Sequence, residues 1–430
     1  MSFEIKNNVL ERYIEEDGIT EVAIPYGVRV ISKYAFWNCR SLTAVSIPVG
    51  VIRIHDRAFW NCRRLKTVNL PDSVVSIGCS AFLDCTNLES IRIPKNVDTI
   101  CYGAFMNCRS LRCVSIPDTL TTIDSYAFSG CWKLTKISLP ANLLTIGKYA
   151  FENCTSLSAL HAPNTLTSIH SSAFKGCTSL IDISLPKCEI GEEAFTDTAW
   201  LEHMRSCDPL VILNGTLLDG RTSFGEVAVP DNVTAISPKA FYKCKDLFSI
   251  TIPDSIKTIE NKTFEGCEEL SSVTFPESLS DFNDNMFQKC ERLDQIHWIG
   301  HLKIRGLDSN YDGSQIVDAL RMVKTKDFSI KMPDELKMLF ISAMYLESCD
   351  SEAFQFIKKN KIEFVESAIR RGDQDFLYAL IKAEGIFTKR NIDKFLEYAI
   401  HNEQPVIFMQ LLHFKEGNLD FQATESKLKL

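Results

Sequence analysis

An apolar pattern repeats every 23 residues along most of the chain. Each repeat usually opens with Ala-Phe, places a Cys three residues after the Phe and a Leu three residues after the Cys, and then alternates polar and apolar residues up to a proline. The two most regular columns are Phe36, Phe59, Phe82, Phe105, Phe128, Phe151, Phe174, Phe241, Phe264, Phe287 and Cys39, Cys62, Cys85, Cys108, Cys131, Cys154, Cys177, Cys244, Cys267, Cys290. A fixed period of this length predicts a solenoid, because a single short coil cannot bury its apolar side whereas stacked coils can. Both columns should therefore form buried structural ladders.

Within one repeat, the alternation predicts a short strand. In Leu42–Pro48, Val45 and Ile47 should face inward, and Ala44 and Ser46 outward. The proline should end the strand, because it has no N–H to donate to the next coil. The preceding stretch "AFWNC" predicts a single helical turn that buries Phe and Cys on one side. The residue before the Cys is Asn, Asp or Gly in most repeats, which favours a left-handed backbone that closes the turn.

The cysteines raise the question of thiol chemistry. A free cysteine packs as a small apolar side chain. Parallel side chains on stacked coils place their β-carbons about 5 Å apart, wider than a disulfide prefers. No Cys-x-x-Cys pair is present to bind zinc. We therefore expect structural thiols and neither a metal nor a cofactor, with Cys79, Cys101 and Cys113 as the positions most open to another role.

The pattern "AFxxCxxLxxVxIPxxVxxI" resembles the BspA-type leucine-rich repeat, a bacterial 23-residue variant, over roughly residues 20–300. The resemblance implies a curved solenoid with parallel strands on its concave face and single helical turns or short coils elsewhere. Many members of this family are surface proteins that bind host matrix proteins or other cells. An adhesin on the cell surface is therefore one reading of this chain.

The amino terminus favours a different location. "MSFEIKNNVLERYIEEDG" lacks the basic start and apolar run of a signal peptide. No apolar run approaches the roughly 20 residues that span a bilayer. From the sequence we expect a cytoplasmic protein without membrane insertion, with export to the surface by an unrecognised route as the alternative.

The 23-residue period breaks within residues 196–230. The segment "ILNGTL" matches "IKNNVL" near the amino terminus, and "EVAVP" matches "EVAIP". This predicts two solenoid blocks, residues 1–200 and 201–301, each opened by a strand-turn-strand unit, with "TAWLEHM" as a short linking helix and a change of curvature near residues 196–220. A single degenerate coil is the alternative.

Helical periodicity replaces the repeat in residues 312–430. The segment 364–385 resembles the segment 395–417 at a spacing near 31 residues, and residues 340–361 form a looser third copy. This predicts an all-α domain of helical hairpins that resembles ankyrin repeats, although the ankyrin "TPLH" turn is absent. Such a domain could cap the open end of the solenoid or bind a partner itself. The fold class is thus an α+β repeat protein.

Motif and charge arguments exclude several functions. The sequence contains no phosphate-binding loop, no His-Glu-x-x-His and no nucleophile elbow. His297 and His301 are four apart, but their context does not indicate a helix or a metal site. The net charge of −8 argues against nonspecific nucleic-acid binding. We therefore do not expect an enzyme or a nucleic-acid-binding protein.

The remaining hypothesis is a monomeric scaffold that binds a protein partner or an extended peptide on the concave strand face. The candidate contact residues are Asn69, Arg92, Ser115, Lys136, Ser138, His161, Asp182 and Thr251. Most side chains of that face are small and neutral, which has an alternative explanation that involves no ligand: small hydroxyl side chains also suit tightly stacked strands. Binding by the helical domain is a further option.

Overall fold

The computed structural model describes residues 2–308 and 310–418. The chain forms two compact units. The first comprises Met1–Gly220 and Ser237–Ala240, and the second comprises Arg221–Ile236 and Phe241–Leu430. Each unit is described below by itself.

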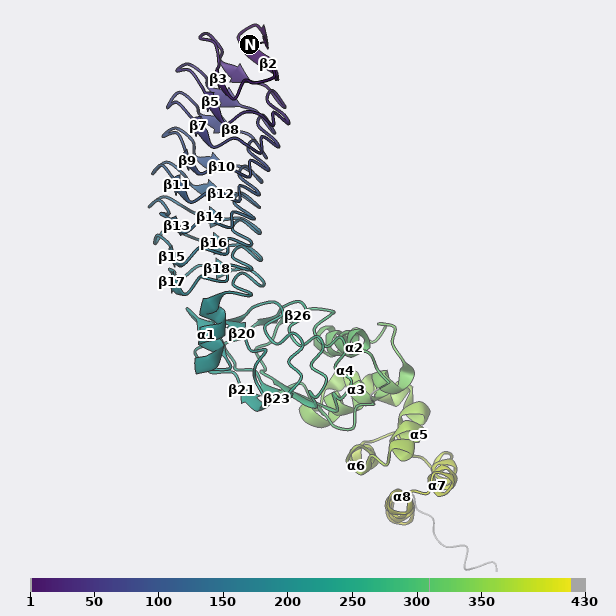
Figure 1. The fold of residues 1–430 in the computed structure, drawn as a ribbon. Helices are drawn as coiled ribbons and strands as arrows, with labels where there is room; N and C mark the ends of the chain where they lie inside the picture. Colours follow the sequence, from purple (N-terminus) through teal and green to yellow (C-terminus); the bar gives the residue numbers. More distant parts are fainter. Residues whose placement is uncertain (1, 309, 419–430) are drawn as a thin grey trace, which may run out of the picture. The chain divides into compact units, whose positions relative to one another are not determined.

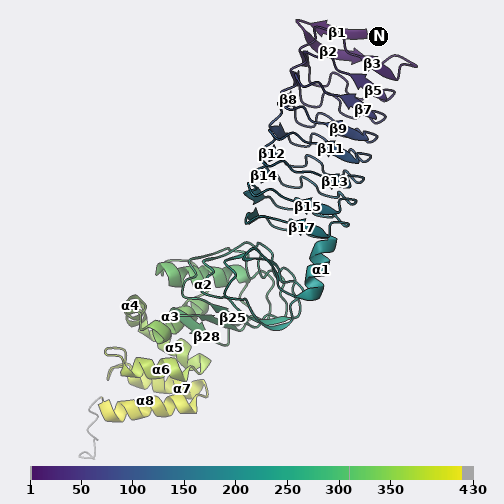
Figure 2. The same ribbon diagram turned by 90° about the vertical axis from the view of Figure 1, so that its left-hand side faces the viewer.

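The first unit is a solenoid in which each coil contributes two short strands (Figures 1 and 2). What we call the main strands are β3 (Glu21–Ala23), β5 (Ala44–Ser46), β7 (Thr67–Asn69), β9 (Ser90–Arg92), β11 (Cys113–Ser115), β13 (Lys136–Ile137), β15 (Ala159–His161) and β17 (Asp182–Ser184). What we call the second strands are β4 (Val30–Ile31), β6 (Arg53–Ile54), β8 (Ser76–Ile77), β10 (Thr99–Ile100), β12 (Thr122–Ile123), β14 (Thr145–Ile146), β16 (Ser168–Ile169) and β18 (Glu189–Ile190). Neighbouring coils pair in parallel at the repeat spacing, as in Ala44 with Thr67.

The main strands follow the predicted alternation. Val45 and Ile47 are buried, Ala44 is half-buried and Ser46 is exposed. The second strands were not predicted as strands. They carry the isoleucine column that includes Ile54 and Ile77, and they are two residues long in each coil, too short for alternation to be recognised.

The Ala-Phe segment does not form the helical turn that we expected. Successive backbone N–H groups bond alternately to a carbonyl of the same turn and to a carbonyl of the next coil. Trp37 N donates to the Tyr34 carbonyl of its own turn at 2.9 Å, whereas Phe36 N donates to the Ala58 carbonyl of the next coil at 2.7 Å. A continuous helix does not alternate in this way, because it directs its N–H groups to carbonyls four residues earlier in the same segment. Tyr34 and Asn38 both adopt φ of +63°, a left-handed backbone that a helical turn excludes. The left-handed residue before the Cys is confirmed, and the one at Tyr34 was missed.

Phenylalanine rings form the core ladder of the first unit. From Phe36 to Phe195, consecutive rings stack with centroids 4.8–5.6 Å apart. Each predicted phenylalanine is buried. The predicted cysteine ladder is buried too, except that Cys290 is only partly buried.

Both ends of this ladder are covered within the first unit. Strands β1 (Ser2–Lys6) and β2 (Val9–Ile14) form an antiparallel hairpin, and the ring of Tyr13 stacks on Phe36 at 5.3 Å. At the other end, α1 (Ala199–Cys207) packs its buried Trp200 edge-on against Phe195 at 5.4 Å. A second hairpin of β19 (Val211–Leu213) and β20 (Thr216–Asp219) follows. Both predicted strand-turn-strand units are thus present as hairpins, and the predicted short helix is present as α1.

The second unit continues the repeat and then turns helical. Its strands are β21 (Gly225–Ala228), β22 (Ala235–Ile236), β23 (Leu247–Thr251), β24 (Thr258–Ile259), β25 (Ser272–Phe275), β26 (Asp281–Phe282), β27 (Gln295–Trp298) and β28 (Leu302–Ile304). Its helices are α2 (Gly313–Thr325), α3 (Asp334–Ser348), α4 (Ser351–Lys359), α5 (Lys361–Arg371), α6 (Gln374–Lys382), α7 (Ile392–His401) and α8 (Pro405–Asn418). Strand β28 is antiparallel to β27.

The helices cover the last coil of the second unit and then form pairs (Figure 1). Helix α3 contacts β28, and the Arg321 guanidinium of α2 contacts Asp284 and the Phe282 carbonyl. Helices α3 and α4, α5 and α6, and α7 and α8 contact each other in turn. The predicted helix pairs are therefore confirmed, and α2 and α3 close the end of the repeat.

Candidate protein-interaction surface

The outward side chains of the main strands form one continuous face of the first unit, which we call the main strand face. Asn69, Arg92, Ser115 and His161 all lie on it and are exposed. The other predicted contact residues of this face, Lys136, Ser138, Asp182, are exposed as well. Parallel register brings Cys113 beside both Ser90 and Lys136. The structure thus places seven of the eight predicted residues on one face. Thr251, exposed on β23, belongs to the second unit.

Several hydroxyl groups on this face are exposed to solvent. Among the described residues, Ser46, Ser115 and Ser138 make no side-chain hydrogen bond to protein. Elsewhere the hydroxyls are used by the fold, since Thr43 Oγ1 donates to the Thr20 carbonyl of the previous coil at 3.1 Å. The same pairing recurs in Thr86, Thr121, Thr135, Thr155, Thr167 and Thr178. The threonines whose hydroxyls bond to the previous coil therefore lie outside the main strands, whereas the hydroxyls of Ser46, Ser115 and Ser138 are exposed to solvent.

Three of the predicted contact residues, Arg92, His161 and Asp182, already contact a side chain that can carry the opposite charge. Arg92 lies 2.8 Å from the Asp72 carboxylate, and this hydrogen bond lowers the pKa of Asp72. His161 Nε2 lies 3.3 Å from the carboxylate of Asp182 on the next coil. Both pairs are well exposed, so water screens them and a partner could replace them at small cost.

A shallow depression lies over three neighbouring main strands. It has a volume of about 350 Å³ and is lined by Ala44, Val45, Ser46, Thr67, Val68, Asn69, Ser90, Ile91 and Arg92. Most of its lining side chains are small, and Arg92 is the one charged residue among them. Such a surface suits an extended chain better than a compact small molecule, because it is open and lacks enclosing walls.

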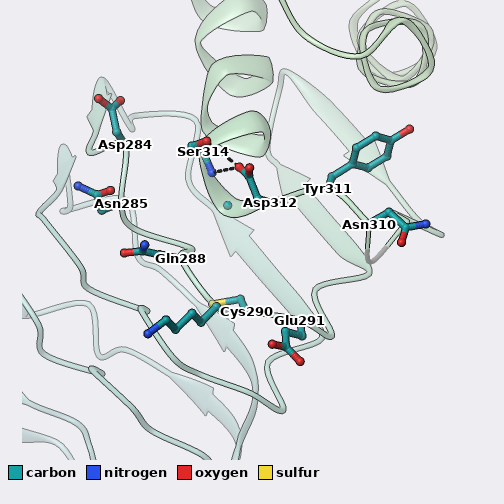
Figure 3. Close-up of a pocket in the computed structure, with 11 residues that line it drawn as sticks. Asp284, Asn285, Gln288, Cys290, Glu291, Asn310, Tyr311, Asp312 and Ser314 are labelled. Carbon is teal, nitrogen blue, oxygen red and sulfur yellow. Dashed lines mark hydrogen bonds between the residues drawn. The ribbon is translucent and has the colours of Figure 1, made fainter.

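A second hollow, in the second unit, was not predicted. It has a volume of about 500 Å³ and lies where the start of α2 meets the turn that carries Phe287 in the last coil (Figure 3). Asp312 caps α2 by accepting hydrogen bonds from the backbone N–H groups of Ser314 and Gln315, both at 2.9 Å. A β-carbon on Gly313 would lie 2.4 Å from the Phe287 carbonyl, so α2 can approach the coil only with glycine there.

The side chains of this hollow do not form a catalytic set. Cys290 Sγ donates to the Phe264 carbonyl at 3.0 Å, and burial raises the pKa of Cys290 to about 12. The thiol is therefore protonated and a poor nucleophile at neutral pH. Asp284 is already paired with Arg321. Sequence reasoning missed this hollow because it depends on how α2 packs against the coil.

The buried cysteines contact the backbone of the previous coil. Cys62 Sγ lies 3.0 Å from the Phe36 carbonyl of the previous coil, and the same thiol-to-carbonyl contact recurs at 3.1–3.3 Å for Cys85, Cys108, Cys131, Cys154, Cys177 and Cys267. All sixteen cysteines are free. Within the described ranges 2–308 and 310–418, no three His, Cys, Asp or Glu side chains gather as a metal site would require.

Comparison with known protein families identifies the repeat. A model of the BspA type leucine rich repeat region, in six copies, matches residues 10–131, 98–222 and 216–309. The chain therefore belongs to the BspA-type leucine-rich-repeat family. A search of curated protein sequences found no match.

Solved structures similar to this chain are leucine-rich-repeat proteins. One from Bacteroides ovatus is 25% identical with a TM-score of 0.48, covering 73% of this chain and 78% of its own. A leucine-rich cell surface protein from Faecalibacterium prausnitzii is 23% identical with a TM-score of 0.41, covering 69% and 92%. The pneumococcal vaccine antigen PcpA is 16% identical with a TM-score of 0.36, covering 69% and 78%. Among the described helices, none combines the length and the apolar character needed to cross a membrane.

Proposed function

We propose that this chain is a non-enzymatic protein-binding scaffold that holds its partner on the main strand face of the first unit. The observation that carries the proposal is the set of open hydrogen-bonding groups on that face, in contrast to the paired hydroxyls beside it. Ser46, Ser115 and Ser138 present hydroxyls to solvent, and regular spacing between coils repeats them along the solenoid axis. An extended segment of a partner can satisfy such a row of groups one coil at a time.

The architecture supports a rigid surface. The phenylalanine ladder and the thiol-to-carbonyl contacts fix each coil against the next. A pre-formed face loses little conformational entropy on binding, which favours affinity. The open depression over β5, β7 and β9 is consistent with a macromolecular partner.

The direct test uses capture from source cells with a blocked face. The tagged full chain is compared with a Ser115→Trp/Ser138→Trp variant, whose bulky rings fill the main strand face. The control is Arg53→Trp/Ser76→Trp, which places the same rings on exposed positions of β6 and β8. We expect a stoichiometric protein partner that the wild type and the control retain and the blocked variant loses. Equal capture by all three chains would contradict the proposal.

A cell-surface adhesin is the second candidate function. The family match over residues 10–309 favours it, since adhesion to matrix proteins or cells is what the resemblance implies. Protease treatment of intact source cells separates the two candidates. Loss of the chain from intact cells supports the adhesin, whereas survival until lysis supports an internal scaffold.

A further inference from the structure

The segments that lead into and include the main strands of the first unit carry a local excess of positive charge that the net charge of the chain conceals. Five successive Cys-to-Pro segments, within residues 39–140, hold nine cations against the single acid Glu89, which leaves +8. The whole chain carries −8. The corresponding segments of the second unit, within residues 244–299, hold two cations against five acids, which leaves −3. The charge is therefore specific to these five coils.

We call these nine cations the basic strand patch: Arg40, Arg63, Arg64, Lys66, Arg92, Arg109, Arg112, Lys133 and Lys136. All nine are exposed. With parallel coils about 4.8 Å apart, the patch extends roughly 20 Å along the solenoid axis. It overlaps the depression lined by Arg92 and continues past it to Lys136.

Most of these cations lack an ionic partner. Arg92 is paired with Asp72, and Arg109 lies over the ring of Trp132 at 4.4 Å. Arg40 and Arg63 donate only to neutral Asn38 and Asn61, at 3.0 and 2.7 Å. Among the described residues, Arg64, Lys66, Arg112, Lys133 and Lys136 form no ion pair.

Acidic groups bound the patch at its ends. Glu15, Glu16 and Asp17 line a cleft of about 550 Å³ together with Arg40, Arg63 and Arg64. At the other end stands Asp182 on β17. A ligand that follows the axis therefore meets an excess of cations on the central coils, where Glu89 and Asp72 are the nearby acids, and further acids towards both ends.

We propose that the basic strand patch binds an extended, acidic segment of a partner protein. This inference rests on the protein-binding role proposed above and adds the chemistry of the partner. Six of the nine cations are arginines, whose planar forks bind carboxylates through two hydrogen bonds. The open serine hydroxyls between them can donate to the same carboxylates or to the segment's backbone. The short extent of the patch fits a segment of a few residues.

A nucleic acid fits the surface less well. A phosphate backbone carries charge uniformly along its length and would run onto the acids at either end. Binding of single strands relies on free aromatic faces that stack on bases. The aromatic ring within the patch, Trp132, is already covered by Arg109.

The test is fluorescence anisotropy with the full chain and two labelled probes: a 12-residue peptide of Glu, Asp, Ser and Gly, and a 12-nucleotide oligothymidylate. The patch variant is Arg64→Glu/Lys66→Glu/Lys133→Glu/Lys136→Glu. The matched control, Lys95→Glu/Lys187→Glu/Lys257→Glu/Lys303→Glu, changes the net charge equally at exposed lysines outside the patch. Circular dichroism confirms that both variants fold.

We expect the acidic peptide to bind and to weaken at least about tenfold in the patch variant, but less than about twofold in the control. Absence of peptide binding, equal loss in both variants, or tighter binding of the oligonucleotide would overturn the inference. The capture experiment described above, repeated with the patch variant, tests the proposed protein-binding role independently of the acidic segment. If the Ser115→Trp/Ser138→Trp variant fails to capture the partner but the patch variant captures it, the proposed protein-binding role is supported. The same result contradicts the inference that the partner binds through an acidic segment.

Discussion

The buried cysteine of each coil contributes both packing and a hydrogen bond. A cysteine fills the space of a small apolar side chain and also donates its weak S–H to the carbonyl of a phenylalanine one coil earlier, at 3.2 Å for Cys131 and Phe105. Alanine would fill less space and could not donate. This explains why the sequence uses cysteine without any sign of thiol chemistry.

The phenylalanine ladder should dominate stability. Phe128 is fully buried between Phe105 and Phe151, whereas Ser138 is exposed. We expect Phe128→Ala to lower the free energy of unfolding by about 3–5 kcal/mol, because it leaves a cavity between stacked rings. Ser138→Ala should change it by no more than about 0.5 kcal/mol. Urea denaturation measures both changes. Equal losses in the free energy of unfolding for Phe128→Ala and Ser138→Ala would show that the inward and outward columns are wrongly assigned.

Thiol reactivity should follow burial. Cys113, Cys207 and Cys349 are exposed, and the ladder thiols from Cys39 to Cys267 are buried. We expect these three to react rapidly with a chromogenic disulfide reagent in the native protein, and the ladder to react only in denaturant. Mass spectrometry after alkylation identifies the sites. Rapid native labelling of Cys131 would contradict the ladder.

The buried thiols should also make stability depend on pH. Burial raises the pKa of Cys108, Cys131 and Cys154 above the ordinary thiol value of 9.0. Above pH 9 the unfolded chain releases these protons while the folded chain keeps them. The free energy of unfolding should therefore fall as pH rises past 9, by up to about 1.4 kcal/mol per pH unit for each thiol.

Denaturant melts between pH 8 and 10 measure this slope. A Cys131→Ala/Cys154→Ala variant, though less stable throughout, should show a shallower decline because two of the thiols are gone. An unchanged slope would mean that other groups, such as tyrosines or lysines, cause the decline.

At the scale of elements, the sequence predicts those parts whose pattern is long enough to read. The main strands, the helix pairs and both strand-turn-strand units were predicted correctly. The second strands were missed because two residues cannot show alternation. The Ala-Phe turn was mistaken for a helical turn because a spacing of three between Phe36 and Cys39 fits either conformation, and hydrogen bonds between coils decide the outcome. The boundary near residue 200 stays a prediction.

Helix α1 and its hairpin are held by an ion pair that can be tested. Arg205 contacts both carboxylate oxygens of Asp219, at 3.1 and 2.8 Å, and the Asp219 side chain is 3% exposed. Arg205→Ala leaves this carboxylate buried with less compensation, so we expect a loss of roughly 3 kcal/mol in stability. Lys175→Ala, which removes a more exposed contact to Glu193, is the control. Similar melting temperatures for wild type and Arg205→Ala would contradict a structural role for the pair.

At the scale of the whole molecule, the net charge does not reveal how charge is distributed locally. The net charge of −8 argued against nonspecific nucleic-acid binding, yet nine exposed cations lie in the Cys-to-Pro segments of five successive coils, which the repeat stacks beside one another. The candidate residues could be predicted because outward columns follow directly from the repeat. Their ionic partners could not, because Arg92 meets Asp72 and His161 meets Asp182 only through the stacking of coils.

The most direct measurement of the central claim uses a thiol that the protein already carries. Cys113 is exposed at the centre of the main strand face, and Cys349 is exposed at the end of α3 in the second unit. Alkylation of both is followed by mass spectrometry with and without the partner captured from source cells. Binding on the main strand face predicts that the partner slows modification of Cys113 and leaves Cys349 unchanged. Protection of Cys349 with Cys113 still reactive would contradict the account and move the binding site to the helices.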